Sequence, residues 1–181
     1  GHRLEELFGE LPPYGRPLFV SDGGYCACRL PRFSFKRFFR AEPALGVVMK
    51  SLGDATALGG NLAEAIQKAA RGLDVGRDGL GFDGKDFLFG EPGDDAEMTH
   101  CLTLPLDRRI FYLQQALRKG WTAEKVAALT GVGAELLGAL DRIVATARRL
   151  EDSAGGGAIS EDLLRQAKAD GFSDPRAAEP G

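Results

Sequence analysis

The stretch that decides the fold is residues 136–150, LLGALDRIVATARRL. Its apolar side chains recur every three or four residues, a spacing that places them on one face of an α-helix. The stretch therefore predicts a long amphipathic helix that packs against other elements along one side. The apolar stripe consists of Leu136, Leu137, Leu140, Ile143, Val144, Ala147 and Leu150.

Shorter helices are predicted on both sides of this stretch. Each has a capping residue or a proline before it and a glycine after it, which are the usual start and stop signals. The second half of the chain is therefore predicted to be helical, with a break at Gly155–Gly157 and one more helix beginning near Ser173. The three shorter helices are expected from Pro105 to Gly120, from Thr122 to Gly131 and from Ser160 to Gly171.

The first half has a different character, because Gly and Pro break its apolar runs into short pieces. Such pieces are typical of strands and loops. One helix is expected to interrupt them, with Asn61 as its N-cap, Glu64 completing a capping box and Gly72 closing its end. The strands are predicted at residues 18–20, 25–30 and 47–51.

The two halves together predict an α+β protein. A small sheet with unpaired edges and one covering helix comes first, and an all-helical region follows. The stretch Gly81–Glu97 is predicted to join them as a linker, because Gly, Pro and Asp are frequent in it and the acidic cluster Asp94–Glu97 fits a loop. Neither half is expected to be a complete domain by itself.

The composition is that of an ordinary soluble globular protein, with 44% hydrophobic and 27% charged residues. A net charge of −3 gives no bulk attraction to nucleic acid or anionic lipid. No apolar run approaches the roughly 20 residues that a membrane-spanning helix needs. Acidic residues near the N-terminus, Glu5 and Glu6, argue against a secretory signal, so a cytoplasmic protein is expected.

Candidate catalytic and metal-binding groups are sparse. The alternation in Tyr25–Cys28 places both thiols of Cys26 and Cys28 on one face of a strand, as buried structural groups rather than zinc ligands. The histidines, His2 and His100, are expected at the surface or at an interface. Nucleotide-binding glycine motifs and metalloprotease motifs are absent from the sequence, and no catalytic or metal-binding residue is predicted.

A helix-turn-helix is the generic alternative for residues 122–139. A DNA-reading helix would present basic or amide side chains at its start. The second helix here begins with residues 133–139, GAELLGA, which offer one acid and no base. A packed helical pair is therefore favoured over a DNA-binding module.

Several segments of the first half resemble the large subunit of carbamoyl-phosphate synthase. Residues 29–38, RLPRFSFKRF, are similar to its K-I-P-R-F-x-F-x-K-F segment. Residues 45–59, LGVVMKSLGDATALG, are similar to L-G-x-x-M-K-S-x-G-E-x-M-A-I-G, and residues 64–73, EAIQKAARGL, to E-A-x-Q-K-A-x-R-G-L. Residues 1–7 and 81–83 are similar to G-Y-T-L-D-E-L and G-F-D.

The second half continues the resemblance in the same order. Residues 109–113 and 116–120, RIFYL and ALRKG, are similar to R-I-F-Y-I and A-L-R-x-G. Residues 163–168 and 171–174, LLRQAK and GFSD, are similar to L-L-R-x-A-K and G-F-S-D. Each match is weak alone, but together they are collinear and cover nearly the whole chain.

The resemblance implies that residues 1–83 are the C-terminal part of the carboxyphosphate-forming ATP-grasp domain. Residues 84–181 would form the helical oligomerisation domain, incomplete at its C-terminal end. The parent would be an ATP-dependent carbon–nitrogen ligase of pyrimidine or arginine biosynthesis. It would make carbamoyl phosphate from bicarbonate and glutamine-derived ammonia, with ATP and Mg²⁺ or Mn²⁺ as cofactors. Expected partners are the rest of the large subunit, a glutaminase and further copies of the chain, but neither nucleic acid nor membrane.

The resemblance carries no catalytic residue onto this chain, because the family's E-M-N-P-R segment around the first ATP would precede residue 1. The chain alone is therefore expected to be inactive and to bind no cofactor. Lys50, Ser51 and Asp54 are the nearest candidates for the first active site; the competing interpretation is that residues 49–59 form a buried core strand and turn.

Departures from the family leave a degenerate scaffold as an alternative. Asp54 replaces Glu, Thr56 replaces Met, Gly60 stands where Arg is common, and residues 19–24 replace F-E-P-S-I-D.

Overall fold

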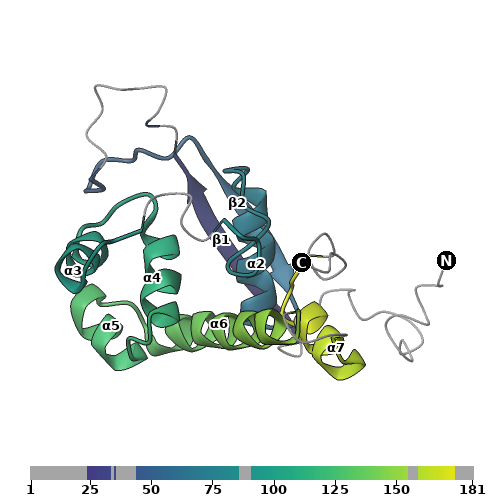
Figure 1. The fold of residues 1–181 in the computed structure, drawn as a ribbon. Helices are drawn as coiled ribbons and strands as arrows, with labels where there is room; N and C mark the ends of the chain where they lie inside the picture. Colours follow the sequence, from purple (N-terminus) through teal and green to yellow (C-terminus); the bar gives the residue numbers. More distant parts are fainter. Residues whose placement is uncertain (1–23, 34, 36–43, 86–90, 155–158, 174–181) are drawn as a thin grey trace, which may run out of the picture.

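The computed structural model describes residues 24–33, 35, 44–85, 91–154 and 159–173. Figure 1 shows a sheet and its covering helix on one side and a group of helices on the other, with the longest helix running beneath both. The described elements are strands β1 (Cys26–Arg32) and β2 (Gly53–Gly59) and helices α2 (Leu62–Gly72), α3 (Asp95–Thr103), α4 (Arg109–Arg118), α5 (Ala123–Thr130), α6 (Ala134–Ala154) and α7 (Glu161–Ala169).

The sheet consists of β1 and β2, which pair antiparallel with Cys26 opposite Gly59 and Arg32 opposite Gly53. Because side chains alternate across a strand, one face carries small or apolar groups and packs on α2. That face is made of Cys26, Cys28 and Leu30 from β1 and Ala55, Ala57 and Gly59 from β2. Both thiols are half-buried on the same face, as predicted.

Helix α2 lies close against β2, and glycine makes the approach possible. A Cβ atom at Gly59 would lie 2.7 Å from the Ala65 nitrogen, inside the helix's first turn. The start of α2 is capped as the sequence indicated: the Glu64 N–H donates to Asn61 Oδ1 at 2.9 Å. The helix buries an alanine-rich stripe around Ile66, which is fully buried.

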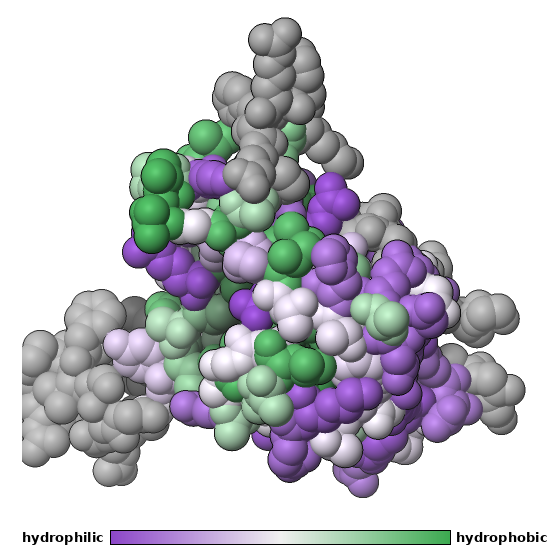
Figure 2. Space-filling view, turned by 90° about the vertical axis from the view of Figure 1, so that its left-hand side faces the viewer, coloured by the Kyte–Doolittle hydropathy of each residue, from purple (hydrophilic) through white to green (hydrophobic). Residues whose placement is uncertain are grey.

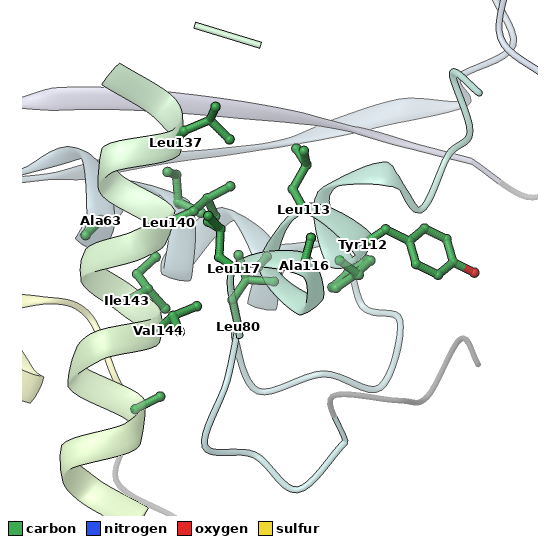
Figure 3. Packing of buried hydrophobic residues seen from close by; sticks show 14 of the residues in the cluster. Ala63, Leu80, Tyr112, Leu113, Ala116, Leu117, Leu137, Leu140, Ile143 and Val144 are labelled. Atoms are coloured by element: carbon green, nitrogen blue, oxygen red, sulfur yellow. The ribbon is translucent and has the colours of Figure 1, made fainter. Parts of the chain in front are cut away.

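Helices α3, α4, α5, α6 and α7 form the helical layer, also called the helical side, whereas β1, β2 and α2 form the sheet side. The helical layer is built on α6, which contacts α2, α4, α5 and α7. Figure 3 shows its Leu137, Leu140, Ile143 and Val144 beside residues of α4 and beside Leu80 from the loop after α2. Burying a side chain of this size contributes about 1.5–3 kcal/mol each. The same hydrophobic cluster includes Ala55 of β2 and Ile66 of α2, so the apolar core is continuous between the sheet side and the helical side.

Most predicted elements are confirmed. The α+β class holds, the strand predicted at 25–30 is β1, and the long helix predicted from residues 136–150 is α6. The helix expected after Asn61 is α2, and the three shorter helices are α4, α5 and α7.

Three local predictions are wrong, wholly or in part. Residues 47–51 form no strand; Val47 and Met49 lie fully or largely in solvent, and pairing with β1 begins only at Gly53. The interpretation of residues 49–59 as a buried core strand and turn holds only in part: Gly53–Gly59 form β2, but only Ala55 and Gly59 are buried in the stretch. Residues 94–97 are not a loop: Asp94 caps α3, and Asp95 begins it.

Some predictions fall on residues outside the described ranges. These are the strand at 18–20, the match at 1–7, the surface position of His2, the break at 155–157 and the helix starting beyond Ser173. The division between residues 83 and 84 stays a prediction. Among the described helices, none is long and apolar enough to cross a membrane.

Candidate functional site

The residues predicted to lie near an active site, Lys50, Ser51 and Asp54, are separated in the structure. Ser51 and Asp54 line one open concave surface at the start of β2, together with Arg29, Pro31, Met49, Leu52 and Gly53. Lys50 does not line it. Its ammonium donates instead to the Ala44 carbonyl at 2.6 Å.

Asp54 is engaged by an arginine across the sheet. Arg29 lies opposite Thr56, so Asp54 is its diagonal neighbour on the solvent-facing side of the two strands. The Arg29 guanidinium donates to the Asp54 carboxylate. A free carboxylate could bind a cation or accept a hydrogen bond. The Asp54 carboxylate is already paired with the positive charge of Arg29.

The segment that carries Lys50 is fixed to the helical side by its backbone. The Leu45 N–H donates to the Pro105 carbonyl at 2.8 Å, and Ala44 and Leu106 form an isolated antiparallel bridge. Beyond this attachment most of its side chains are exposed, whereas Lys50 and Ser51 are half-buried. Figure 2 shows hydrophobic side chains at the surface in this upper part of the molecule. The exposed apolar residues of this segment are Val47, Val48, Met49 and Leu52.

The N-terminus of α2 is the place where a phosphate group would be expected to bind. Gly59 and Gly60 lead into the helix, and helix N-termini attract anions through free N–H groups and the helix dipole. Here the helix fills the site with its own side chains. The Gly60 N–H donates to Glu64 Oε2 at 2.7 Å, so a carboxylate already occupies the anion position. This terminus therefore does not fit a nucleotide phosphate.

Within the described ranges, no group of three or more His, Cys, Asp or Glu side chains is placed to hold a metal ion. The acidic cluster at residues 94–97 acts on its own helix instead. The Glu97 N–H donates to Asp94 Oδ1 at 2.8 Å, and Glu97 accepts from the Gly93 N–H at 2.7 Å. His100 is exposed in α3, as predicted for a surface histidine.

A second concave surface, of about 320 Å³, lies between the end of β1, the end of α2 and the start of α4. Aromatic side chains form part of its wall, with the rings of Phe33 and Phe35 stacked 5.6 Å apart. Its charged residues form two ion pairs, Arg32 with Asp74 and Arg108 with Asp107. Partial burial raises the pKa of Asp107, partly offset by Arg108. Sequence reasoning missed this surface, because its residues come from three separate segments.

Helices α5 and α6 have the order of a helix-turn-helix but pack as a helical pair. Val126 of α5 and Leu137 of α6 are fully buried in the common core. Gly131 closes α5 in the left-handed conformation, with φ of 68°. The first turn of α6 carries Glu135 and no basic residue, which disfavours contact with DNA phosphates.

Residues 54–180 match the family model described as the carbamoyl-phosphate synthetase large chain, oligomerisation domain. This chain belongs to that family. The matched range begins inside β2 and runs through α7, so it includes the sheet's second strand and α2 as well as the helical layer.

Individual relatives agree with the family model. The chain is 35% identical over 181 residues to the carbamoyl phosphate synthase large chain of Rhodopirellula baltica, with 98% of this chain aligned. It is 36% identical to that of Xylella fastidiosa and 33% identical to that of Archaeoglobus fulgidus. The chain spans only 16% of the length of each of these relatives.

Proposed function

We propose that this chain is a structural part of an ATP-dependent ligase that makes carbamoyl phosphate from bicarbonate and ammonia. The family match across residues 54–180 carries the proposal. Among the described residues no side-chain cluster is placed to hold a metal ion, and the Glu64 carboxylate occupies the anion position at the N-terminus of α2. The chain alone is therefore proposed to be inactive, with ATP and its Mg²⁺ or Mn²⁺ bound by other segments of the parent.

The sheet side is proposed to be the end of the carboxyphosphate-forming ATP-grasp domain, up to about residue 83. Two observations support this. The β1–β2 pair leaves both outer strand edges without a partner strand among the described residues. Apolar side chains such as Val48, Met49 and Leu58 are exposed beside it. Exposed apolar groups and strand edges are normally covered by neighbouring structure.

The helical side, from about residue 84, is proposed to mediate contacts between large subunits. Its family description as an oligomerisation domain supports this assignment. The parent is proposed to work in the cytoplasm, with the remainder of the large subunit and a glutaminase as further partners. Lys50, Ser51 and Asp54 are proposed to lie at the edge of the first active site, where they shape its wall without reacting.

A degenerate scaffold is the second candidate. Gly60 offers no side chain where the family commonly has Arg, and Asp54 is shorter than the family's Glu and is paired with Arg29. Loss of a guanidinium removes a rigid bidentate donor. A helix-turn-helix module is disfavoured by the acidic start of α6 and would show salt-dependent DNA affinity.

The test is synthesis of carbamoyl phosphate by the full-length large chain that contains this segment. Bicarbonate, ammonia and MgATP are supplied, and the product is trapped chemically. Product formation by the full-length protein, and none by the 181-residue chain, is the expected result. A folded full-length protein that forms no product would favour the scaffold.

A further inference from the structure

We propose that the contacts of helix α2 with the helical layer form a rigid joint. Because of this joint, the sheet side and the helical side unfold locally together, as one cooperative unit. The helix contacts both strands on one side and α6 on the other. This inference goes beyond the proposed function, because it rests on contacts alone and holds whether or not the parent is active.

The centre of the joint is the side chain of Gln67. It is buried in α2, and its amide bonds to both backbone groups of Leu80: Nε2 donates to the Leu80 carbonyl at 3.0 Å, and the Leu80 N–H donates to Oε1 at 2.6 Å. Leu80 in turn is fully buried in the core shared with α4 and α6. Pulling α2 away would leave two buried backbone groups and one buried amide without partners.

The loop that carries Leu80 is itself attached to the helical layer. The guanidinium of Arg77 lies 5.3 Å from the ring centre of Phe111 in α4. Gly81 approaches α6 so closely that a Cβ atom there would lie 3.1 Å from that of Ala147. The loop thus connects α2 to α4 and α6.

The end of α7 holds α2 from a second direction. Asn61 Nδ2 donates to the Ala169 carbonyl at 2.8 Å, and Arg71 Nη1 donates to the Gly171 carbonyl at 2.6 Å. A Cβ atom at Gly171 would lie 3.0 Å from the Glu64 Cα, so α7 ends directly on the backbone of α2. These contacts join residues that are 100 or more positions apart in the chain.

Attachment at both ends and at the middle of one short helix leaves no free hinge on the helical side of α2. With this attachment, α2 opens to solvent only when α6 does. Native-state hydrogen exchange tests this on the 181-residue chain, by comparing the slowest amides of α2, such as that of Ile66, with those of α6, such as that of Ile143. Their protection factors are expected to agree within about threefold. If the α2 amides exchange more than about tenfold faster while α6 stays protected, the inference is overturned.

Two variants locate the joint. Gln67→Leu keeps most of the volume but removes both bonds to Leu80. Asn61→Asp keeps the cap of α2 but removes the donor to Ala169. Each is expected to make α2 exchange faster than α6 by roughly tenfold or more. Val126→Ala in α5 is the matched control and is expected to speed exchange in both helices equally. Equal loss of protection in both helices in the two joint variants would overturn the role assigned to these side chains.

Discussion

Arg77 and Asp83 form a buried ion pair in the loop between α2 and α3, with 2.6 Å between Nε and Oδ2. Solvent reaches 0% of the first side chain and 4% of the second. The carboxylate also accepts the N–H groups of Asp78 at 3.3 Å and Lys85 at 3.0 Å. One aspartate thus organises the turn that presents Leu80 to the core.

Breaking this ion pair is expected to destabilise the fold strongly. Arg77→Met leaves the Asp83 charge buried without its cation, and such a loss costs about 3–5 kcal/mol. Asp83→Leu should cost a similar amount for the reciprocal reason. The double variant should cost clearly less than the sum, because it leaves no unpaired charge. Urea denaturation of the four proteins measures the coupling.

The exposed ion pair next to it provides the matched control. Lys85 Nζ lies 3.1 Å from Asp78 Oδ2, and about half of each side chain is exposed. Lys85→Met should therefore cost no more than about 1 kcal/mol. Similar costs for the Arg77 and Lys85 variants would show that burial does not govern the strength of the pair.

Two glycines with nearly the same backbone conformation should respond differently to alanine. Gly120 has φ of 91° and open space around its missing Cβ, whereas Gly171 has φ of 87° and the backbone of α2 about 3.0 Å away. Gly120→Ala should cost about 1–2 kcal/mol from the left-handed conformation alone. Gly171→Ala should cost about 1–3 kcal/mol more, because α7 must move away from α2. Thermal unfolding of both variants checks the difference, and equal costs would mean that the close approach is absent in solution.

Asp94 is expected to contribute to stability as the N-cap of α3. Asp94→Ala removes the acceptor for the Glu97 N–H and should cost about 0.5–2 kcal/mol. Asp94→Asn keeps an equivalent acceptor and should change the free energy of unfolding by only a few tenths of a kcal/mol. Chemical denaturation monitored through Trp121, the single tryptophan, measures both. An Asn variant as unstable as the Ala variant would exclude the capping role.

Glu64 should make stability depend on pH in the acidic range. The Lys68 ammonium donates to its carboxylate and has the largest effect, and the Gly60 N–H also donates to it. Both hydrogen bonds lower the pKa of Glu64 in the folded protein. The stabilisation that Glu64 gives to the fold is therefore fully present above its unfolded-state pKa of about 4.3. It is lost as the pH falls through the lower pKa of the folded state. Glu64 is partly covered, with 22% of its side chain exposed, but its partner Lys68 is 43% exposed, so solvent screens the pair and the contribution should stay below about 1 kcal/mol.

The variant Glu64→Gln isolates this effect. It removes the titrating group, so the difference in stability between the wild type and the variant should shrink as pH falls from 6 towards 3. Urea midpoints measured across this range give the comparison. A difference that stays constant or grows at acidic pH would contradict the assigned pKa direction.

The sequence predicted the helices well, because their signals are local. Asn61, Thr122 and Ser160 each accept a backbone N–H at the start of a helix, as their positions before apolar periodic runs indicated. Helix α3 carried the same kind of signal, Asp94 followed three residues later by Glu97, but its charges favoured a loop interpretation. Met98 and Leu102, spaced by one helical turn and fully buried, could have revealed it.

The strands were harder to place, because their position depends on tertiary contact. The apolar run at residues 47–49 predicted a strand, yet these side chains are exposed. The true partner of β1 has small inward residues, Ala55 and Gly59, since α2 packs too closely for larger ones. Alternation of small residues is a weak signal beside an apolar run.

The site could be predicted only in part. Ser51 and Asp54 share a concave surface, but no local pattern could show that Lys50 points to the Ala44 carbonyl or that Arg29 reaches Asp54 across the sheet. The joint at Gln67 was also missed. A buried glutamine leaves no periodic signature, and its partner Leu80 lies 13 residues away in a glycine-rich loop.

The most direct test of the proposed function is bicarbonate-dependent ATP hydrolysis by the full-length parent in the absence of ammonia. This partial reaction isolates the half of the enzyme to which the sheet side is assigned. Phosphate release is expected to rise on addition of bicarbonate and to be absent from the 181-residue chain. A correctly folded parent whose ATP hydrolysis does not respond to bicarbonate would contradict the proposal and identify the segment as part of a scaffold.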